Sequence, residues 1–178
     1  MCKKLLCILL AAVMLCCCML PASAAAETGV IRVKLHSDIA GLTKDDDAEH
    51  FIELLSDNVV YRVHRGGPVS VADYAGTSCR NELVAGRTYY IDYCLQAADG
   101  YTLPETISDG DVQIECGDSI DVYAVQITTG NYRNEDGTVT VEKGLRIQAR
   151  VVVDGRLFQR ITGFLYDIYL KIRAWSLY

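Results

Sequence analysis

The chain has 178 residues, with 17 Lys and Arg against 23 Asp and Glu, so its formal net charge is −6 at pH 7. This acidic balance argues against a nucleic-acid-binding protein, because such proteins carry a basic surface. We therefore expect no nucleic acid partner. The length is enough for one domain with a hydrophobic core, and no internal repeat or second domain is visible.

Residues 1–24 have the composition of a secretion signal. Two lysines precede an apolar run over 5–20, and an Ala-Ser-Ala cleavage site follows at 22–24. Cleavage after Ala24 or after Ala26 fits this pattern equally well. The sequence therefore predicts a secreted protein that is extracellular or associated with the cell envelope.

Two other interpretations of this N-terminal segment remain open. An uncleaved anchor is the second choice, because the apolar run is a little shorter than the ~20 residues of a membrane span. A lipoprotein is less favoured, because Leu15 precedes Cys16 where a lipidation motif requires a small residue. Removal of 1–24 would leave 15 basic and 23 acidic residues, a net charge of −8.

Three of the eight cysteines lie beyond the signal, at Cys79, Cys94 and Cys116. An odd number outside the cytoplasm allows at most one internal disulfide and leaves one other thiol. A bridge between Cys94 and Cys116 is our first expectation, and one between Cys79 and Cys94 is the second. Spacing alone does not decide between them.

The first elements expected after the signal are a strand over 29–36 and a short helix over about 44–55. The helix is predicted because Thr43 can cap it, acidic residues follow, and apolar residues recur at spacings of three and four. The aspartates at 45–47 are interpreted as the charged first turn of this helix, and a cation site is the less favoured alternative. Further strands are expected over 58–64 and at 69–71.

The clearest strand lies within the segment from Gly86 to Glu105. Residues 89–96 alternate between two faces, which is typical of a half-buried strand. The set expected to face inwards is Tyr89, Ile91, Tyr93 and Leu95. Asp99-Gly100 ends the strand, because this pair readily supplies the positive φ of a tight turn.

A resemblance to a known family rests on these same residues. The pattern comprises Gly86, Thr88, Tyr89, the alternating Ile91, Tyr93 and Leu95, and then Asp99-Gly100-Tyr101. It resembles a pattern in the immunoglobulin-like β-sandwich modules of secreted and cell-surface proteins of Gram-positive bacteria. The match is good over about twenty residues and loose over 30–155. The resemblance implies an immunoglobulin-like fold for 25–155 and leaves the ligand open.

Later strands are expected over 111–116, 120–128, 139–141 and 145–153, with a loop over 130–137. Asp-Gly pairs and single glycines separate these strands. About eight short strands with such turns are typical of a β-sandwich or barrel. We therefore predict a mostly β fold, an immunoglobulin-like β-sandwich with a short helical insert.

The C-terminal segment, 156–178, follows a helical period instead. Its apolar stripe has spacings of three and four throughout, and consists of Phe158, Ile161, Leu165, Ile168, Ile172 and Trp175. The segment has a net charge of +3, whereas 25–155 has −11. A basic, aromatic helix on an acidic body is typical of an element that binds a surface. The stripe can contact a membrane interface, a partner or second copy, or the chain's own sandwich, and the sequence leaves these three open.

No catalytic, cofactor-binding or metal-binding motif stands out. The three histidines share no zinc-ligand spacing with a cysteine, and neither a nucleophile elbow nor a phosphate-binding loop occurs. We therefore expect a non-enzymatic interaction or adhesion module without a cofactor, which binds a protein or glycan ligand. The alternative is a carbohydrate-binding accessory domain, for which tyrosines such as Tyr90 would form a sugar platform. A secreted hydrolase is less favoured than either.

Overall fold

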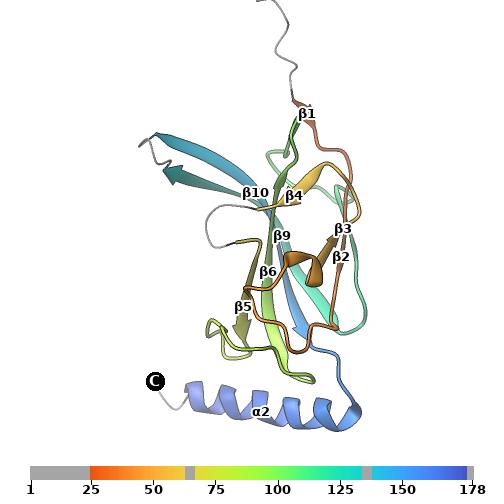
Figure 1. Ribbon diagram of the computed structural model, residues 1–178, viewed down its shortest axis with the longest axis vertical. Helices are drawn as coiled ribbons and strands as arrows, with labels where there is room; N and C mark the ends of the chain where they lie inside the picture. The colour runs from red at the N-terminus through yellow and green to blue at the C-terminus, as the bar shows by residue number, and fades with distance from the viewer. Residues whose placement is uncertain (1–24, 63–66, 134–137, 176–178) are drawn as a thin grey trace, which may run out of the picture.

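The computed structural model describes residues 25–62, 67–133 and 138–175, and the expected signal peptide at 1–24 lies outside this part. Within the described part the chain is mostly β-strand, with one α-helix at its C-terminal end (Figure 1). The elements in chain order are β1 (Ala26–Glu27), β2 (Ile31–Leu35), the 3-10 helix η1 (Ala48–His50), β3 (Ile52–Leu54), β4 (Val59–Tyr61), β5 (Val69–Asp73), β6 (Thr88–Ala97), β7 (Tyr101–Thr102), β8 (Val112–Glu115), β9 (Ile120–Arg133), β10 (Val139–Val152) and α2 (Leu157–Trp175).

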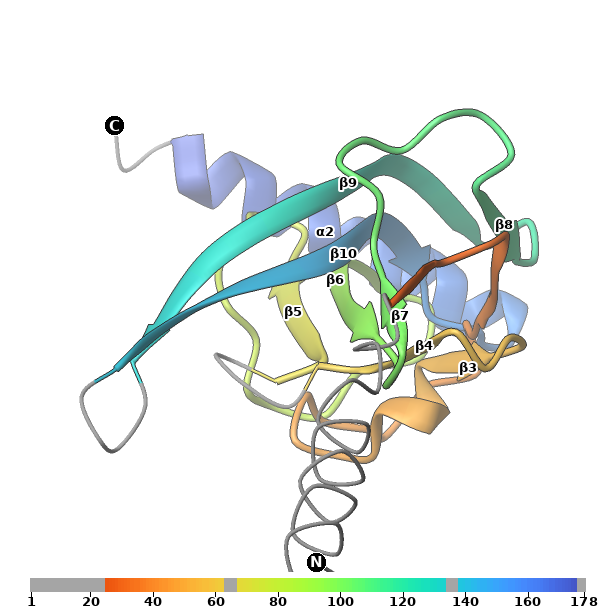
Figure 2. The same ribbon diagram turned by 90° about the horizontal axis from the view of Figure 1, so that it is seen from above.

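Five strands form the larger sheet. Its order is β4-β6-β10-β9, and β5 also pairs with β6. All of these pairs are antiparallel. Strands β9 and β10 pair along nearly their whole lengths and form a long curved hairpin that extends beyond the rest of the sheet (Figure 2). We call this the large sheet.

Three strands form the small sheet, in the order β3-β2-β8. Strand β2 pairs with β3 in the antiparallel sense and with β8 in the parallel sense. The parallel pair joins residues about eighty positions apart, such as Val33 and Ile114. The short strands β1 and β7 form a separate parallel pair.

One hydrophobic core joins the two sheets. The inward set predicted for β6 is confirmed, because Tyr89, Ile91, Tyr93 and Leu95 are each 1% exposed or less. Alternate residues of the neighbouring β10 and of β2 in the small sheet belong to the same cluster; they include Leu145, Ile147, Ala149, Val151, Ile31, Val33 and Leu35. The period-two pattern of each strand thus places one face in the core and leaves the other outside.

The helix expected over 44–55 is wrong in its extent. Only Ala48–His50 are helical, and Ile52–Leu54 form β3, paired with β2. Asp46 instead closes a tight turn, since its carboxylate accepts hydrogen bonds from the Thr43 backbone at 2.6 Å and from the Thr43 hydroxyl at 2.9 Å. Residues 52–54 pair with the edge of β2, and this strand pairing outweighs the local helical pattern.

The two late strands expected over 139–141 and 145–153 are one strand, β10, and β9 continues into the expected loop as far as Arg133. Gly144 does not interrupt the ladder, and it pairs with Thr128. A Cβ atom at this position would lie 3.2 Å from the carbonyl oxygen of Leu95, so the glycine allows β10 to approach β6 closely.

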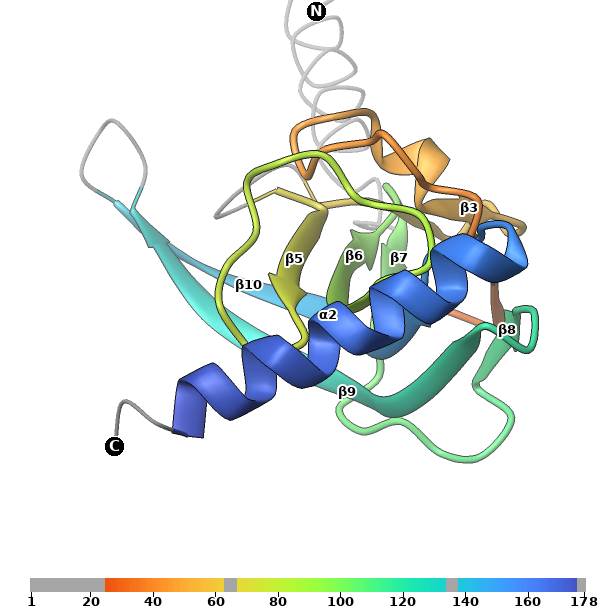
Figure 3. The same cartoon turned by 90° about the horizontal axis from the view of Figure 1, so that it is seen from below.

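The predicted C-terminal helix is present as α2. It begins shortly after β10 ends and lies across the ends of the strands of the large sheet (Figures 1 and 3). Its axis runs across the strands, so one side of the helix faces the body and the opposite side faces away from it.

Candidate functional site

The apolar stripe of α2 is on the side that faces away from the body. Five of its predicted members are between 39% and 76% exposed, namely Ile161, Leu165, Ile168, Ile172 and Trp175. Phe158 belongs to the helix, but its side chain lies outside the described part. Phe164 and Tyr169 extend the same surface and are 63% and 54% exposed. We call these seven described residues the apolar face of α2.

A different face of α2 contacts the body. Gly163 and Asp167 are buried, and Leu170 and Ala174 are partly buried. Their spacings of four, three and four place them in one row on the helix. This row lies roughly opposite Leu165 and Ile172, so the docking face and the apolar face point in opposite directions.

Two glycines allow the helix to approach the large sheet at backbone distance. A Cβ atom at Gly163 would lie 2.0 Å from the carbonyl oxygen of Gly86, and a Cβ atom at Gly86 would lie 2.1 Å from that of Gln159. Gly86 also has a φ of +82°, which side chains disfavour. Only glycine at both positions fits this contact.

A buried carboxylate fixes the next turn of the helix. Asp167 is 2% exposed, and its Oδ2 atom accepts a hydrogen bond of 2.9 Å from the backbone N–H of Thr88, at the start of β6. The Arg87 Nε atom lies 3.8 Å from Asp167 Oδ1. Burial raises the pKa of Asp167, while the hydrogen bond from Thr88 and the charge of Arg87 act in the opposite direction.

Arg87 also contacts two aromatic rings. Its guanidinium carbon lies 4.2 Å from the ring centroid of Tyr166 on α2 and 5.5 Å from that of Tyr89 in the core. These distances allow cation–π attraction. The guanidinium therefore links the helix, the buried carboxylate and the core.

Basic residues flank the apolar face. Arg160 lies 3.4 Å from the carboxylate of Asp154, and the Lys171 ammonium lies 5.2 Å from the ring centroid of Tyr74. Asp167 is the only acidic side chain between Leu157 and Trp175, and it is buried. The exposed surface of α2 thus combines apolar and cationic groups. The described part contains no helix that is both long and apolar enough to cross a membrane.

A second feature lies on the outer face of the large sheet. Tyr90 of β6 stacks on Tyr74, with ring centroids 6.3 Å apart, and makes a T-shaped contact with Tyr123 at the same centroid distance. The register of β9 shifts at this point, so that Tyr123 is an extra residue opposite Gln148 and Ala149. Such a bulge redirects a side chain, and here Tyr123 reaches Tyr90.

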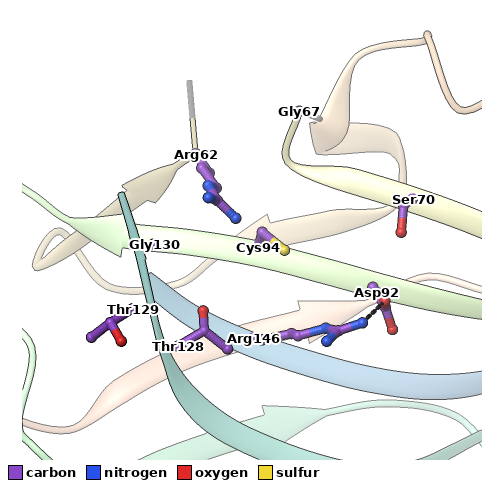
Figure 4. A pocket seen from close by; sticks show the side chains of 9 residues that line it. All are labelled: Arg62, Gly67, Ser70, Asp92, Cys94, Thr128, Thr129, Gly130 and Arg146. Atoms are coloured by element: carbon purple, nitrogen blue, oxygen red, sulfur yellow. Dashed lines mark hydrogen bonds and ion pairs between the residues drawn. The ribbon is translucent and has the colours of Figure 1, made fainter. Parts of the chain in front are cut away.

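Polar side chains adjoin these rings. Asp92 accepts a hydrogen bond from Arg146 and another, of 2.8 Å, from Gln148. The hydrogen bond to Asp92 raises the pKa of Arg146 further above its ordinary value. Burial and the nearby Asp92 carboxylate raise the pKa of Tyr123. Figure 4 shows Arg146 and Asp92 from neighbouring strands directed at one another.

Two adjoining hollows surround this polar cluster. The larger has a volume of about 480 Å³ and is lined by Arg62, Ser70, Asp92, Cys94 and Arg146, among others (Figure 4). The smaller has a volume of about 280 Å³ and is lined by Tyr90, Tyr123 and Gln148, together with Ser70 and Asp92. The two hollows share Ser70 and Asp92, so they adjoin on the outer face of the large sheet, and we call them together the groove.

The disulfides expected for Cys94 with Cys116, or with Cys79, are not formed in the structure, where all three cysteines are free. Cys94 lines the groove on the outer face of β6. Cys116 is exposed and follows β8 in the small sheet, on the other side of the core. The outward direction of Cys94 keeps it away from the small sheet, which explains why this pair does not meet.

The aspartates at 45–47, which were expected to form the first turn of a helix, lie in a non-helical turn instead. Asp45 pairs with Lys44, and Asp46 binds the Thr43 backbone. Across the described ranges, no group of three or more histidine, cysteine or acidic side chains is arranged to hold a metal ion.

Sequence reasoning missed the contacts that hold α2. Neither Gly163 nor Asp167 belongs to the apolar stripe from which the helix was predicted. The signal available was their spacing of four residues, which places a small and an acidic side chain in one row opposite the stripe. The role of Tyr123 had no signal, because it depends on a bulge in the pairing of β9 with β10.

Comparisons of the chain with family models, with curated proteins and with solved structures found no match.

Proposed function

We propose that this chain is a secreted, non-enzymatic interaction module of immunoglobulin-like type, which attaches to an anionic lipid surface through the apolar face of α2. The observation that carries the proposal is the outward direction of that face. Seven large apolar side chains lie on it, each at least 39% exposed, while a glycine and a buried carboxylate hold the opposite face to the body. An exposed apolar surface of this kind is typical of an interaction site.

The composition of the exposed surface favours a lipid interface. Trp175 and Tyr169 have rings with an apolar body and a polar edge, which suit the headgroup region. Lys171 and Arg160 flank the apolar side chains and carry their charges on long apolar stems. Such stems allow the charge to remain at the level of the lipid phosphates while the apolar face is buried.

The basic charge of α2 disfavours a second copy of the chain as the main partner of its apolar face. Two α2 helices paired through their apolar faces would bring the basic side chains beside each face, such as Lys171, near those of the other copy. Over Leu157–Trp175 the helix offers no exposed carboxylate, because Asp167 is buried. An anionic membrane supplies the missing negative charge.

The charge asymmetry of the chain also sets its orientation on such a surface. Residues 156–178 have a net charge of +3, and residues 25–155 have −11. An anionic membrane attracts the helix and repels the body, so the groove on the outer face of the large sheet would remain accessible.

Co-sedimentation with vesicles tests the proposal. The chain from residue 25 onwards is expected to sediment with vesicles of phosphatidylcholine and phosphatidylglycerol, more weakly with phosphatidylcholine alone, and less at high salt. Replacing Leu165 and Ile172 together with glutamine removes two exposed apolar groups and preserves helix propensity. This double variant is expected to bind about 100-fold more weakly.

The matched control replaces Val139 and Val141 with glutamine. These residues are 58% and 67% exposed on β10, outside α2. The control is expected to bind vesicles as the unchanged chain does. If vesicle binding is absent, and the unchanged chain instead elutes as a dimer that the Leu165 and Ile172 substitutions dissociate, the lipid proposal is wrong and α2 is an assembly surface.

A further inference from the structure

The groove on the outer face of the large sheet is a second surface, built by elements other than α2. We define it by Ser70, Tyr90, Asp92, Tyr123, Arg146 and Gln148, which come from four adjacent strands. The apolar face of α2 contributes none of these side chains. An inference about the groove is therefore independent of the lipid attachment.

The aromatic part of the groove presents rings at its surface. Tyr123 is 52% exposed, although its ring makes a T-shaped contact with Tyr90. Tyr90 also stacks on Tyr74, whose ring is in turn contacted by Lys171. The rings are thus supported by the fold, and the β9 bulge directs the most exposed one into the groove.

The polar part of the groove is arranged in advance of any ligand. Both oxygens of Asp92 accept hydrogen bonds, one from Arg146 and one from Gln148. Neighbouring strands hold these three planar groups at adjacent positions, since Gln148 pairs directly with Asp92 in the β-ladder. Planar carboxylate, guanidinium and amide groups can form paired hydrogen bonds to neighbouring hydroxyls.

The charges of the groove are balanced. Arg146 is paired with Asp92, and Arg62 lies 3.7 Å from the carboxylate of Glu142. This balance leaves no excess charge of either sign to attract an ion. The groove therefore suits an uncharged ligand that combines many hydroxyls with an apolar face.

We propose that this groove binds a neutral oligosaccharide. The C–H face of a sugar ring would pack on Tyr123 and Tyr90, since aromatic side chains provide large rigid apolar surfaces with polar edges. Its hydroxyls would bind Asp92, Arg146, Gln148 and Ser70 at the floor. The two adjoining hollows, of about 480 and 280 Å³, would each receive part of such a ligand.

A glycan array tests this proposal with the chain from residue 25 onwards. The probes are immobilised oligosaccharides of neutral hexoses, N-acetylhexosamines, pentoses and uronic acids. We expect binding to at least one neutral class. Tyr123→Ala is expected to weaken it at least tenfold, and Gln148→Ala is expected to weaken it as well. Circular dichroism checks that both variants are folded.

Tyr169→Ala is the matched control, because Tyr169 is 54% exposed and also contacts another tyrosine, Tyr166. It is expected to leave glycan binding unchanged and to weaken vesicle binding, and Tyr123→Ala is expected to do the reverse. This crossed pair separates a failure of the groove from a failure of the lipid attachment. The groove proposal is overturned if no neutral glycan binds, if uronic acids alone bind, or if both groove variants bind as the unchanged chain does.

Discussion

Replacing Gly86 with alanine is expected to release α2 from the large sheet. The new methyl group would lie 2.1 Å from the carbonyl oxygen of Gln159, which belongs to the helix backbone and cannot turn away as a flexible side chain would. The helix must therefore shift as a body. We expect a loss of about 1–3 kcal/mol from the clash, in addition to about 1–2 kcal/mol for alanine at positive φ.

Gly41→Ala is the matched control for this prediction. Gly41 has a φ of +86°, close to the +82° of Gly86, but no atom would lie within 4 Å of its added methyl group. The two variants thus share the backbone cost, and only Gly86→Ala adds the clash. Hydrogen exchange is expected to speed up over the α2 amides in Gly86→Ala alone. Equal exchange in the two variants would show that the glycine contact does not hold the helix.

Replacing Asp167 with alanine is expected to be the next most damaging change. The backbone N–H of Thr88 would lose its acceptor, and Arg87 would lose the carboxylate 3.8 Å away. Leaving a buried donor unsatisfied costs about 1–3 kcal/mol. Asp167→Asn keeps an acceptor oxygen at the same place, so we expect it to lose less stability in urea unfolding. Equal losses in the two variants would contradict a role for this hydrogen bond.

The buried carboxylate of Asp167 also predicts a dependence of stability on pH. Burial raises the pKa of Asp167, and Asp73 acts in the same direction, whereas Thr88 and Arg87 act against it. A carboxyl with a raised folded pKa binds protons more readily in the folded state, so its contribution to stability increases as the pH falls through that value. The contribution is complete below the ordinary pKa of an aspartate, about 3.9.

The unchanged chain is therefore expected to gain stability relative to Asp167→Asn as the pH is lowered from neutrality. The comparison with Asp167→Asn removes the effects of other titrating groups, which both proteins share. Urea unfolding at a series of pH values measures the difference. A difference that shrinks or reverses on acidification would mean that Arg87 and Thr88 dominate and the folded pKa is not raised.

Patterns with a short period were predicted well from the sequence. The inward set of β6 depends only on alternation, because successive side chains of a strand point to opposite faces. The stripe of α2 likewise depends only on the helical repeat. Both are local properties, and in the structure the first set is buried and the second lies along one side of a helix.

Segments whose apolar residues suit both a helix and a strand were predicted incorrectly. Residues 48–55 carry apolar side chains at spacings that suit a helix, yet Ile52–Leu54 form β3 because the edge of β2 is available to them. The absence of a disulfide among Cys79, Cys94 and Cys116 also depends on tertiary packing. Which of them could meet depends on how the two sheets pack, and that packing leaves Cys94 on the outside of β6.

The sequence alone determined that this chain is mostly β-strand with a basic, apolar-striped helix at its C-terminal end, because these features arise from residues close together in the chain. Only the tertiary structure decided which face of that helix is free. Gly86 and Gly163 permit a backbone contact, and Asp167 finds the N–H of Thr88, so the helix docks through its small and acidic residues. The apolar stripe faces outwards as a result, since one rigid helix cannot present both faces to the same sheet.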